Sequence, residues 1–179
     1  MANESLTQVD ENVEALQTDL LEKFDKESKT RKFGSKGFEQ FVYWTAIIIA
    51  LYHFITSFVG YPATHLHRSL HVGMMLVMAF VLYPATKKSS RSKMAWYDYL
   101  FSVLAMAVVV YIWSDYAGFI NRMGMPNTMD VIMGTLLILL VMEASRRISG
   151  LPLVILSALF LAYGLFGKYM PSIFMHRGY

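Results

Sequence analysis

Five long apolar runs constrain the fold of this chain more than any other feature of its sequence. In chain order they cover residues 38–59, 67–85, 98–116, 129–146 and 151–168. Each run approaches or exceeds the roughly 18 to 20 residues that a helix needs to cross about 30 Å of hydrocarbon. Charged side chains lie only near the ends of the runs, because an ionised group at the centre of an inserted helix costs about 2.5 to 3.5 kcal/mol. We therefore predict an all-α membrane protein with about five transmembrane helices.

The composition agrees with a membrane protein and excludes several kinds of chemistry. Of the 179 residues, 55% are hydrophobic and 16% are charged, which leaves too little polar surface for a soluble domain. The chain has no cysteine, so disulfide exchange, thiolate catalysis and iron–sulfur clusters are excluded. The first 36 residues are polar, and we expect no cleavable signal peptide.

Lysine and arginine are distributed unevenly over the two ends of the predicted helices. Of the 16, twelve fall on the side of the N-terminus and four on the other side, namely Arg68, Arg122, Lys168 and Arg177. Because basic loops stay in the cytoplasm, we predict a cytoplasmic N-terminus and a C-terminus outside. The basic isoelectric point therefore indicates topology rather than nucleic-acid binding. Trp96 and Tyr97 are predicted to anchor the third helix at the interface.

The predicted helices divide the chain into three parts. Residues 1–36 form a cytoplasmic amphipathic helix and a basic linker, because residues 1–30 combine eight of the 13 acidic residues with apolar residues every three or four positions. Residues 37–147 hold four helices. Residues 148–179 hold the fifth, which follows a tight turn at Gly150 and Pro152.

Histidines near the outer ends of the first two helices raise the question of a cofactor. His67 and His71 share a helix face and His65 precedes them, but no carboxylate stands nearby, so we predict no metal site. His53 and His71 lie at similar depth, about 8 Å below the outer interface at 1.5 Å per residue. Bis-histidine haem ligation and a buried, hydrogen-bonded histidine pair both remain open.

Other charged residues near helix ends have structural interpretations. Glu143 and Arg147 are four apart in the favourable order, which predicts an ion pair rather than a proton relay. Thr128 is a candidate cap of the fourth helix, with Asp130 in its first turn. The sequence contains no nucleophile with a base at recognisable spacing, no phosphate-binding glycine loop and no paired carboxylates, so we do not expect an enzyme.

The motifs R-x-x-H, YP, WYD, P-x-T-x-D, EASRR, YxP and HRGY follow one another between about residue 60 and residue 179. In this order and spacing they resemble the N-terminal part of TRAP transporter permeases of the TAXI type. In those proteins a four-helix Q-like small component is often fused, through a connecting helix, to a large M-like component. The resemblance implies that residues 37–147 are the Q-like unit and residues 148–179 the connecting helix. The fused chains continue beyond the position of Tyr179, so a separate subunit and part of a fused permease are both open.

The resemblance also implies a function. Such transporters lie in the bacterial inner membrane, use a sodium or proton gradient, and receive small organic anions such as glutamate or 2-oxoglutarate from a periplasmic TAXI-type binding protein. The large component carries the substrate and cation sites and moves as an elevator, while the Q-like part is a scaffold without a cofactor. The solute, the coupling ion and the helix faces that contact the large component are not identified. The alternative function is a b-type cytochrome membrane anchor with His53 and His71 as haem ligands.

Site residues follow from the resemblance and from the predicted topology. Arg68 and His71 match the R-x-x-H motif at the outer start of the second helix, which implies contact with lipid or with a neighbouring subunit. We expect the same kind of contact for four more residues, Trp96, Tyr97, Arg146 and Arg147. Arg122 lies in an external loop and is a candidate contact for the binding protein.

Overall fold

The computed structural model describes residues 13–14, 16–17, 30–61, 63–86, 89–90, 92–169 and 171, and this part of the chain contains helices and no strand. Five helices are long and apolar enough to cross a membrane, which confirms the all-α part of the predicted fold class and its five membrane-length helices. They are α2 (Lys36–Val59), α3 (Thr64–Leu82), α4 (Trp96–Ser114), α6 (Thr128–Ile148) and α7 (Leu151–Phe166), the last continued by the 3-10 turn η2 (Gly167–Tyr169). Residues 13–14 and 16–17 are helical, and the rest of the predicted N-terminal amphipathic helix lies outside the described residues.

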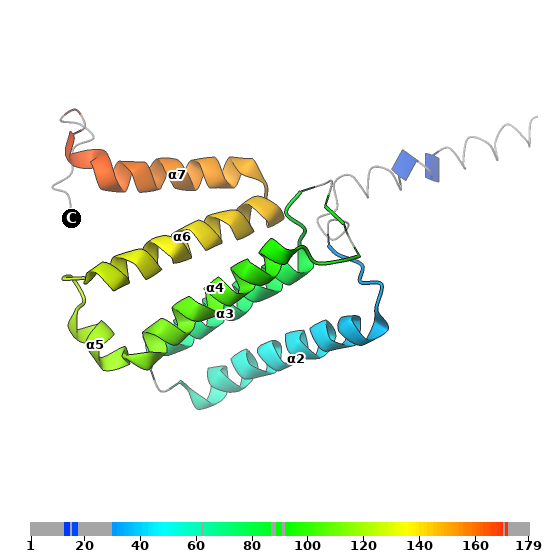
Figure 1. The fold of residues 1–179 in the computed structure, drawn as a ribbon, viewed down its shortest axis with the longest axis horizontal. Helices are drawn as coiled ribbons and strands as arrows, with labels where there is room; N and C mark the ends of the chain where they lie inside the picture. Colours follow the sequence, from blue (N-terminus) through cyan, green and yellow to red (C-terminus); the bar gives the residue numbers. More distant parts are fainter. Residues whose placement is uncertain are drawn as a thin grey trace, which may run out of the picture.

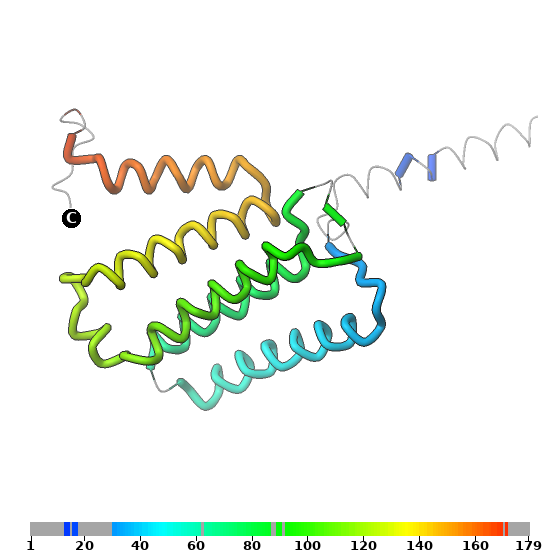
Figure 2. Tube along the Cα trace, in the orientation of Figure 1, coloured from blue at the N-terminus to red at the C-terminus, as the bar shows by residue number. Residues whose placement is uncertain are grey.

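The helices lie side by side in a slab, with α3 and α4 at its centre (Figure 1). Helix α6 packs against α3 and α4, and α2 and α7 lie on opposite flanks, as the trace in Figure 2 shows. Close packing of α3 on α4 requires Gly73, because a Cβ there would lie 2.3 Å from a methyl group of Val109. At Gly134 and Gly164 such a Cβ would have no atom within 4 Å, so no close helix contact of this kind depends on them.

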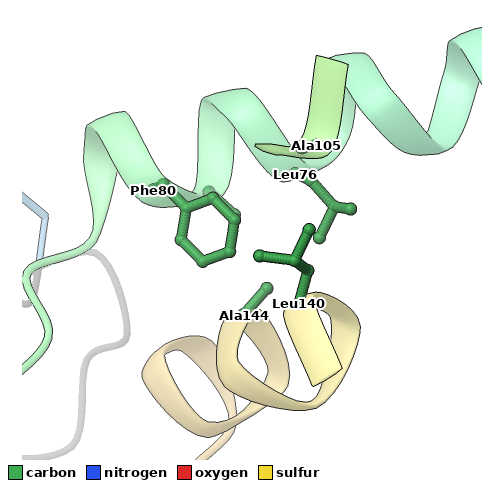
Figure 3. Close-up of a cluster of buried hydrophobic side chains, with 6 residues drawn as sticks. Leu76, Phe80, Ala105, Leu140 and Ala144 are labelled. Carbon is green, nitrogen blue, oxygen red and sulfur yellow. The ribbon is translucent and has the colours of Figure 1, made fainter. Parts of the chain in front are cut away.

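A small apolar core joins the three central helices. Figure 3 shows Leu76 and Phe80 of α3 facing Leu140 and Ala144 of α6, with Ala105 of α4 beside them. These side chains are all buried, and Phe80 is completely so. The two flanking helices contribute almost nothing to this core, since Ile49 is the one buried residue of α2 and α7 has none. Their apolar side chains therefore face the surroundings of the chain.

Helix ends differ from the sequence prediction at several places, for example in α3, which begins and ends three residues earlier than the predicted run 67–85. Asn127, and not Thr128, caps α6: its Oδ1 accepts from the Asp130 N–H at 2.7 Å, and Asp130 Oδ2 accepts from the Asn127 N–H at 2.9 Å. The prediction was wrong by one residue because asparagine and threonine both suit an N-cap. The tight turn before α7 is confirmed, with Gly150 at φ 92° and a proline in the first turn. Arg122 lies at the end of α5 (Tyr116–Asn121), a short helix within the segment that was expected to be a loop.

Candidate functional site

A buried ion cluster is the most unusual polar feature of the described residues. Asp98 in the first turn of α4 forms ion pairs with Arg31, in the segment before α2, and with Arg147, in the last turn of α6. Arg147 Nη1 donates to Asp98 Oδ1 at 2.6 Å, and Arg31 Nη2 donates to Asp98 Oδ2. All three side chains have no exposed surface. One carboxylate thus holds together three segments that are far apart in the sequence.

Glu143 and Arg146 extend the cluster along α6. The predicted pair of Glu143 and Arg147 is confirmed, with Nε to Oε1 at 2.8 Å. Arg146 also binds Glu143, with Nε to Oε2 at 2.8 Å, and its side chain is one-third exposed. The expected lipid or inter-subunit contact is wrong for Arg147, because Asp98 attracts its guanidinium inward, where it lies 4.9 Å from the centre of the Phe80 ring.

The same arginines bind the backbone where α3 ends. Arg31 Nη1 donates to the carbonyl of Val81 at 3.2 Å, and Arg147 Nη1 donates to that of Tyr83 at 3.2 Å. Arg146 Nη2 donates to the carbonyl of Ala85 at 2.9 Å. The last carbonyls of a helix lack partners within the helix and carry partial negative charge, so the guanidinium groups of Arg31 and Arg147 are well placed at Val81 and at the C-cap Tyr83. The cluster is a structural link between α3, α4, α6 and the chain that enters α2.

A second charged group lies at the opposite ends of α4 and α6. Arg122 pairs with Asp115 at 3.0 Å and with Asp130 at 3.1 Å, and Tyr111 donates to Asp130 at 2.7 Å. The hydrogen bond from Arg122, followed by that from the Gly118 N–H, holds the pKa of the Asp115 carboxyl below its ordinary value. The hydrogen bonds to Asp130 and then to Asp115 raise the pKa of Arg122. Arg122 remains 29% exposed, and its contact with a binding protein stays a prediction.

The predicted proximity of His53 and His71 is found, and the two rings bond directly to each other. His53 Nδ1 lies 2.7 Å from the carbonyl of Ile49, so it carries the proton, and His53 Nε2 accepts from His71 Nδ1 at 2.6 Å. His67 Nδ1 bonds the Tyr52 hydroxyl at 2.9 Å. These contacts join the C-terminal part of α2 to the N-terminal part of α3. A metal between two facing imidazoles needs its nitrogens about 4 Å apart, at about 2 Å per bond, so haem ligation would require the rings to separate.

The remaining site residues lie at the surface or near it. Arg68 and His71 are exposed, Trp96 is 75% exposed, and Tyr97 is half-buried with its hydroxyl 3.2 Å from that of Ser89. These positions are accessible to lipid or to another subunit, and that contact stays a prediction. Among the described residues, no three His, Asp or Glu side chains are arranged to hold a metal ion.

Sequence reasoning missed Arg31 and Asp98, which form the centre of the buried cluster. A signal was present, because Asp98 is a lone carboxylate in the first turn of a predicted membrane helix, where a charged group needs a partner. Its partners, Arg31 and Arg147, lie 67 and 49 positions away in the sequence. Helical spacing relates residues three or four positions apart, so it could not identify these pairs.

Comparison of the chain with protein-family models, curated proteins and solved structures finds no match. The likeness to TRAP transporter permeases therefore rests on the order of short motifs.

Proposed function

We propose that this chain is the small membrane component of a TAXI-type TRAP transporter. In this role it is a scaffold for the large elevator component, which takes up small organic anions such as glutamate or 2-oxoglutarate from a periplasmic binding protein at the expense of an ion gradient. The proposal rests on one contrast in the structure. Helices α3, α4 and α6 share an apolar core and a buried ion cluster, whereas the flanking helices α2 and α7 bury almost none of their side chains within the chain. Such a shape suits a part that binds other helices and stays fixed in the bilayer.

The flanking helices carry broad apolar faces. In α2, Phe41, Trp44 and Phe58 are each at least 60% exposed, and in α7 Phe160 and Leu165 are similarly exposed. Helices that are apolar on every side meet either lipid or the helices of a partner. An elevator needs one part held still while another slides, and a wide footprint with interfacial aromatic anchors resists tilting.

The distribution of charge favours a scaffold over a transport path. Ionised groups in the described spans lie within the first two or last two turns of a helix, and Asp98 and Glu143 pair with the arginines of the buried cluster. A substrate or ion path needs polar groups at membrane depth that can be exposed to a cavity. The large component would have to supply these groups.

The proposal is tested by purification and by transport. The chain should co-purify from native membranes with a large polytopic protein, and proteoliposomes that contain both should accumulate labelled glutamate or 2-oxoglutarate when the binding protein and a sodium or proton gradient are supplied. Omission of this chain should abolish uptake. Full uptake by the large partner alone would refute the scaffold role.

The second candidate function is a b-type cytochrome membrane anchor, because His53 and His71 lie next to each other. An absorption spectrum of the purified protein decides between the two, because a bis-histidine haem gives an intense Soret band. A protein without this band, purified from cells that make haem, carries no haem and leaves the scaffold role standing.

A further inference from the structure

A cleft of about 440 Å³ lies where the segment before α2 meets the segment before α4. Phe33, Ser35 and Phe38 line one side of it, and Ser92, Lys93 and Tyr99 line the other. This volume is within the range of small-ligand sites, roughly 300 to 1,000 Å³. The cleft therefore has room for a phosphate-containing headgroup.

The buried ion cluster fixes both walls of the cleft. Arg31 lies two residues before Phe33, and its backbone N–H donates to the carbonyl of Leu82 at 2.8 Å while its side chain binds Asp98. Asp98 directly precedes Tyr99 on the opposite wall. Because the two walls are joined through one ion pair, the cleft exists before any ligand arrives.

The position of the cleft is at the end of two membrane-length helices. Helix α2 begins at Lys36 and α4 begins at Trp96, next to residues that line the cleft. The exposed indole of Trp96 is typical of the zone between headgroups and hydrocarbon. A headgroup in that zone can reach the cleft while its acyl chains run along α2 and α4.

The chemistry of the cleft suits a phosphate with apolar material attached. Lys93 is exposed, and no other described residue pairs with its ammonium group. The Ser35 side chain at the N-cap of α2 makes no capping bond, and its hydroxyl hydrogen is free to be donated in any case because a cap uses the oxygen as an acceptor. The rings of Phe33 and Phe38 meet edge to face at 4.6 Å and form an apolar wall. Ammonium and hydroxyl groups bind phosphate oxygens, and the rings can contact the glycerol and the first methylene groups.

We propose that this cleft binds the headgroup phosphate of an anionic phospholipid in the leaflet next to the first turns of α2 and α4. Lys93 holds the phosphate, and the exposed Lys32 and Lys36 add positive charge beside it. Basic pockets between helix ends select anionic headgroups by this combination of charge and shape. The bound lipid would join the N-terminal linker to α4. This site does not depend on the transport role.

The test uses the full chain, purified in a mild detergent and stripped of lipid. Phosphatidylglycerol and phosphatidylcholine with identical acyl chains are titrated, and bound lipid is counted by native mass spectrometry. We expect one phosphatidylglycerol to be retained in preference to phosphatidylcholine. Lys93→Gln should weaken its binding about fivefold, the effect expected of one lysine near an anionic headgroup. The matched control is Lys168→Gln, which removes an exposed charge beyond the end of α7 and should leave binding unchanged.

Three results would overturn the proposal. Equal retention of the two lipids would show that the headgroup charge is not recognised. Equal loss in the Lys93 and Lys168 variants would show that overall charge, and not the cleft, attracts the lipid. Displacement of phosphatidylglycerol by inorganic phosphate alone at millimolar concentration would identify a site for free anions instead of a lipid.

Discussion

Asp98 is the residue whose burial most needs compensation from the rest of the fold. An ionised carboxylate that leaves water near the edge of the hydrocarbon costs several kcal/mol unless charge and hydrogen bonds compensate. Here the compensation comes from two guanidinium groups and from the Ala95 N–H, which donates at 3.1 Å. Removal of the carboxylate would leave Arg31 and Arg147 buried close together with no charge between them.

Asp98→Asn is therefore expected to destabilise the protein by about 3 to 5 kcal/mol, the usual effect of breaking a buried ion pair from one side. Unfolding of the purified variant in mixed micelles, followed by circular dichroism as dodecyl sulfate is added, measures this change. The matched control is Glu39→Gln, because Glu39 is an exposed carboxylate in the first turn of α2. Similar unfolding curves for the two variants would contradict a structural role of the cluster.

Asp115 gives a residue-scale prediction about pH. Its pKa is lowered by the hydrogen bond from Arg122, so its contribution to stability is complete above the ordinary carboxyl value of 3.8 and is lost as the pH falls through the lowered value. Pepsin should cut the segment around α5 faster as the pH falls below about 3.8. Asp115→Asn should be cut readily at every pH tested. A parallel pH response in the variant and the wild type would assign the effect to pepsin or to another group.

At the scale of helices, the sequence predicts which segments form helices better than it predicts how those helices pack against one another. The five spans follow from run length, because the bilayer thickness imposes a minimum number of apolar residues. Their packing order does not follow, since α7 is apolar on all sides and carries no directional signal. The Glu143–Arg147 pair was predictable from its local spacing. The Arg31–Asp98 pair depends on the tertiary fold, which brings the linker against α4.

The contact between α3 and α4 gives a prediction at the same scale. Gly73→Ala places a methyl group against the Val109 side chain, and such overpacking costs about 1 to 3 kcal/mol. Gly134→Ala is the matched control, because nothing lies within 4 Å of its new Cβ, and alanine in a helix should be neutral or stabilising. The same micelle titration measures both variants. Val109→Ala should rescue Gly73→Ala, and a failure of this rescue would show that the clash is not the cause.

At the scale of the whole molecule, polar links hold the slab together at both ends and apolar contacts fill its centre. The buried cluster ties the linker, α3, α4 and α6 together at one end. At the other end, histidines join α2 to α3, and Arg122 joins α5 to α6. Such links restrict sliding of the helices along one another, which apolar packing alone resists weakly. This rigidity is what a stationary scaffold requires.

The orientation of the slab in the membrane gives the last prediction, and the absence of native cysteine makes it direct to test. Ser90 lies in the loop between α3 and α4, Asn121 ends α5 on the opposite side, and both are exposed. The excess of lysine and arginine on the side of Ser90 predicts that this side is cytoplasmic. In cells with a permeabilised outer membrane, an impermeant maleimide should label Asn121→Cys at once and Ser90→Cys only after lysis. Labelling in the reverse order would invert the topology and remove the outer surface proposed to meet a periplasmic binding protein.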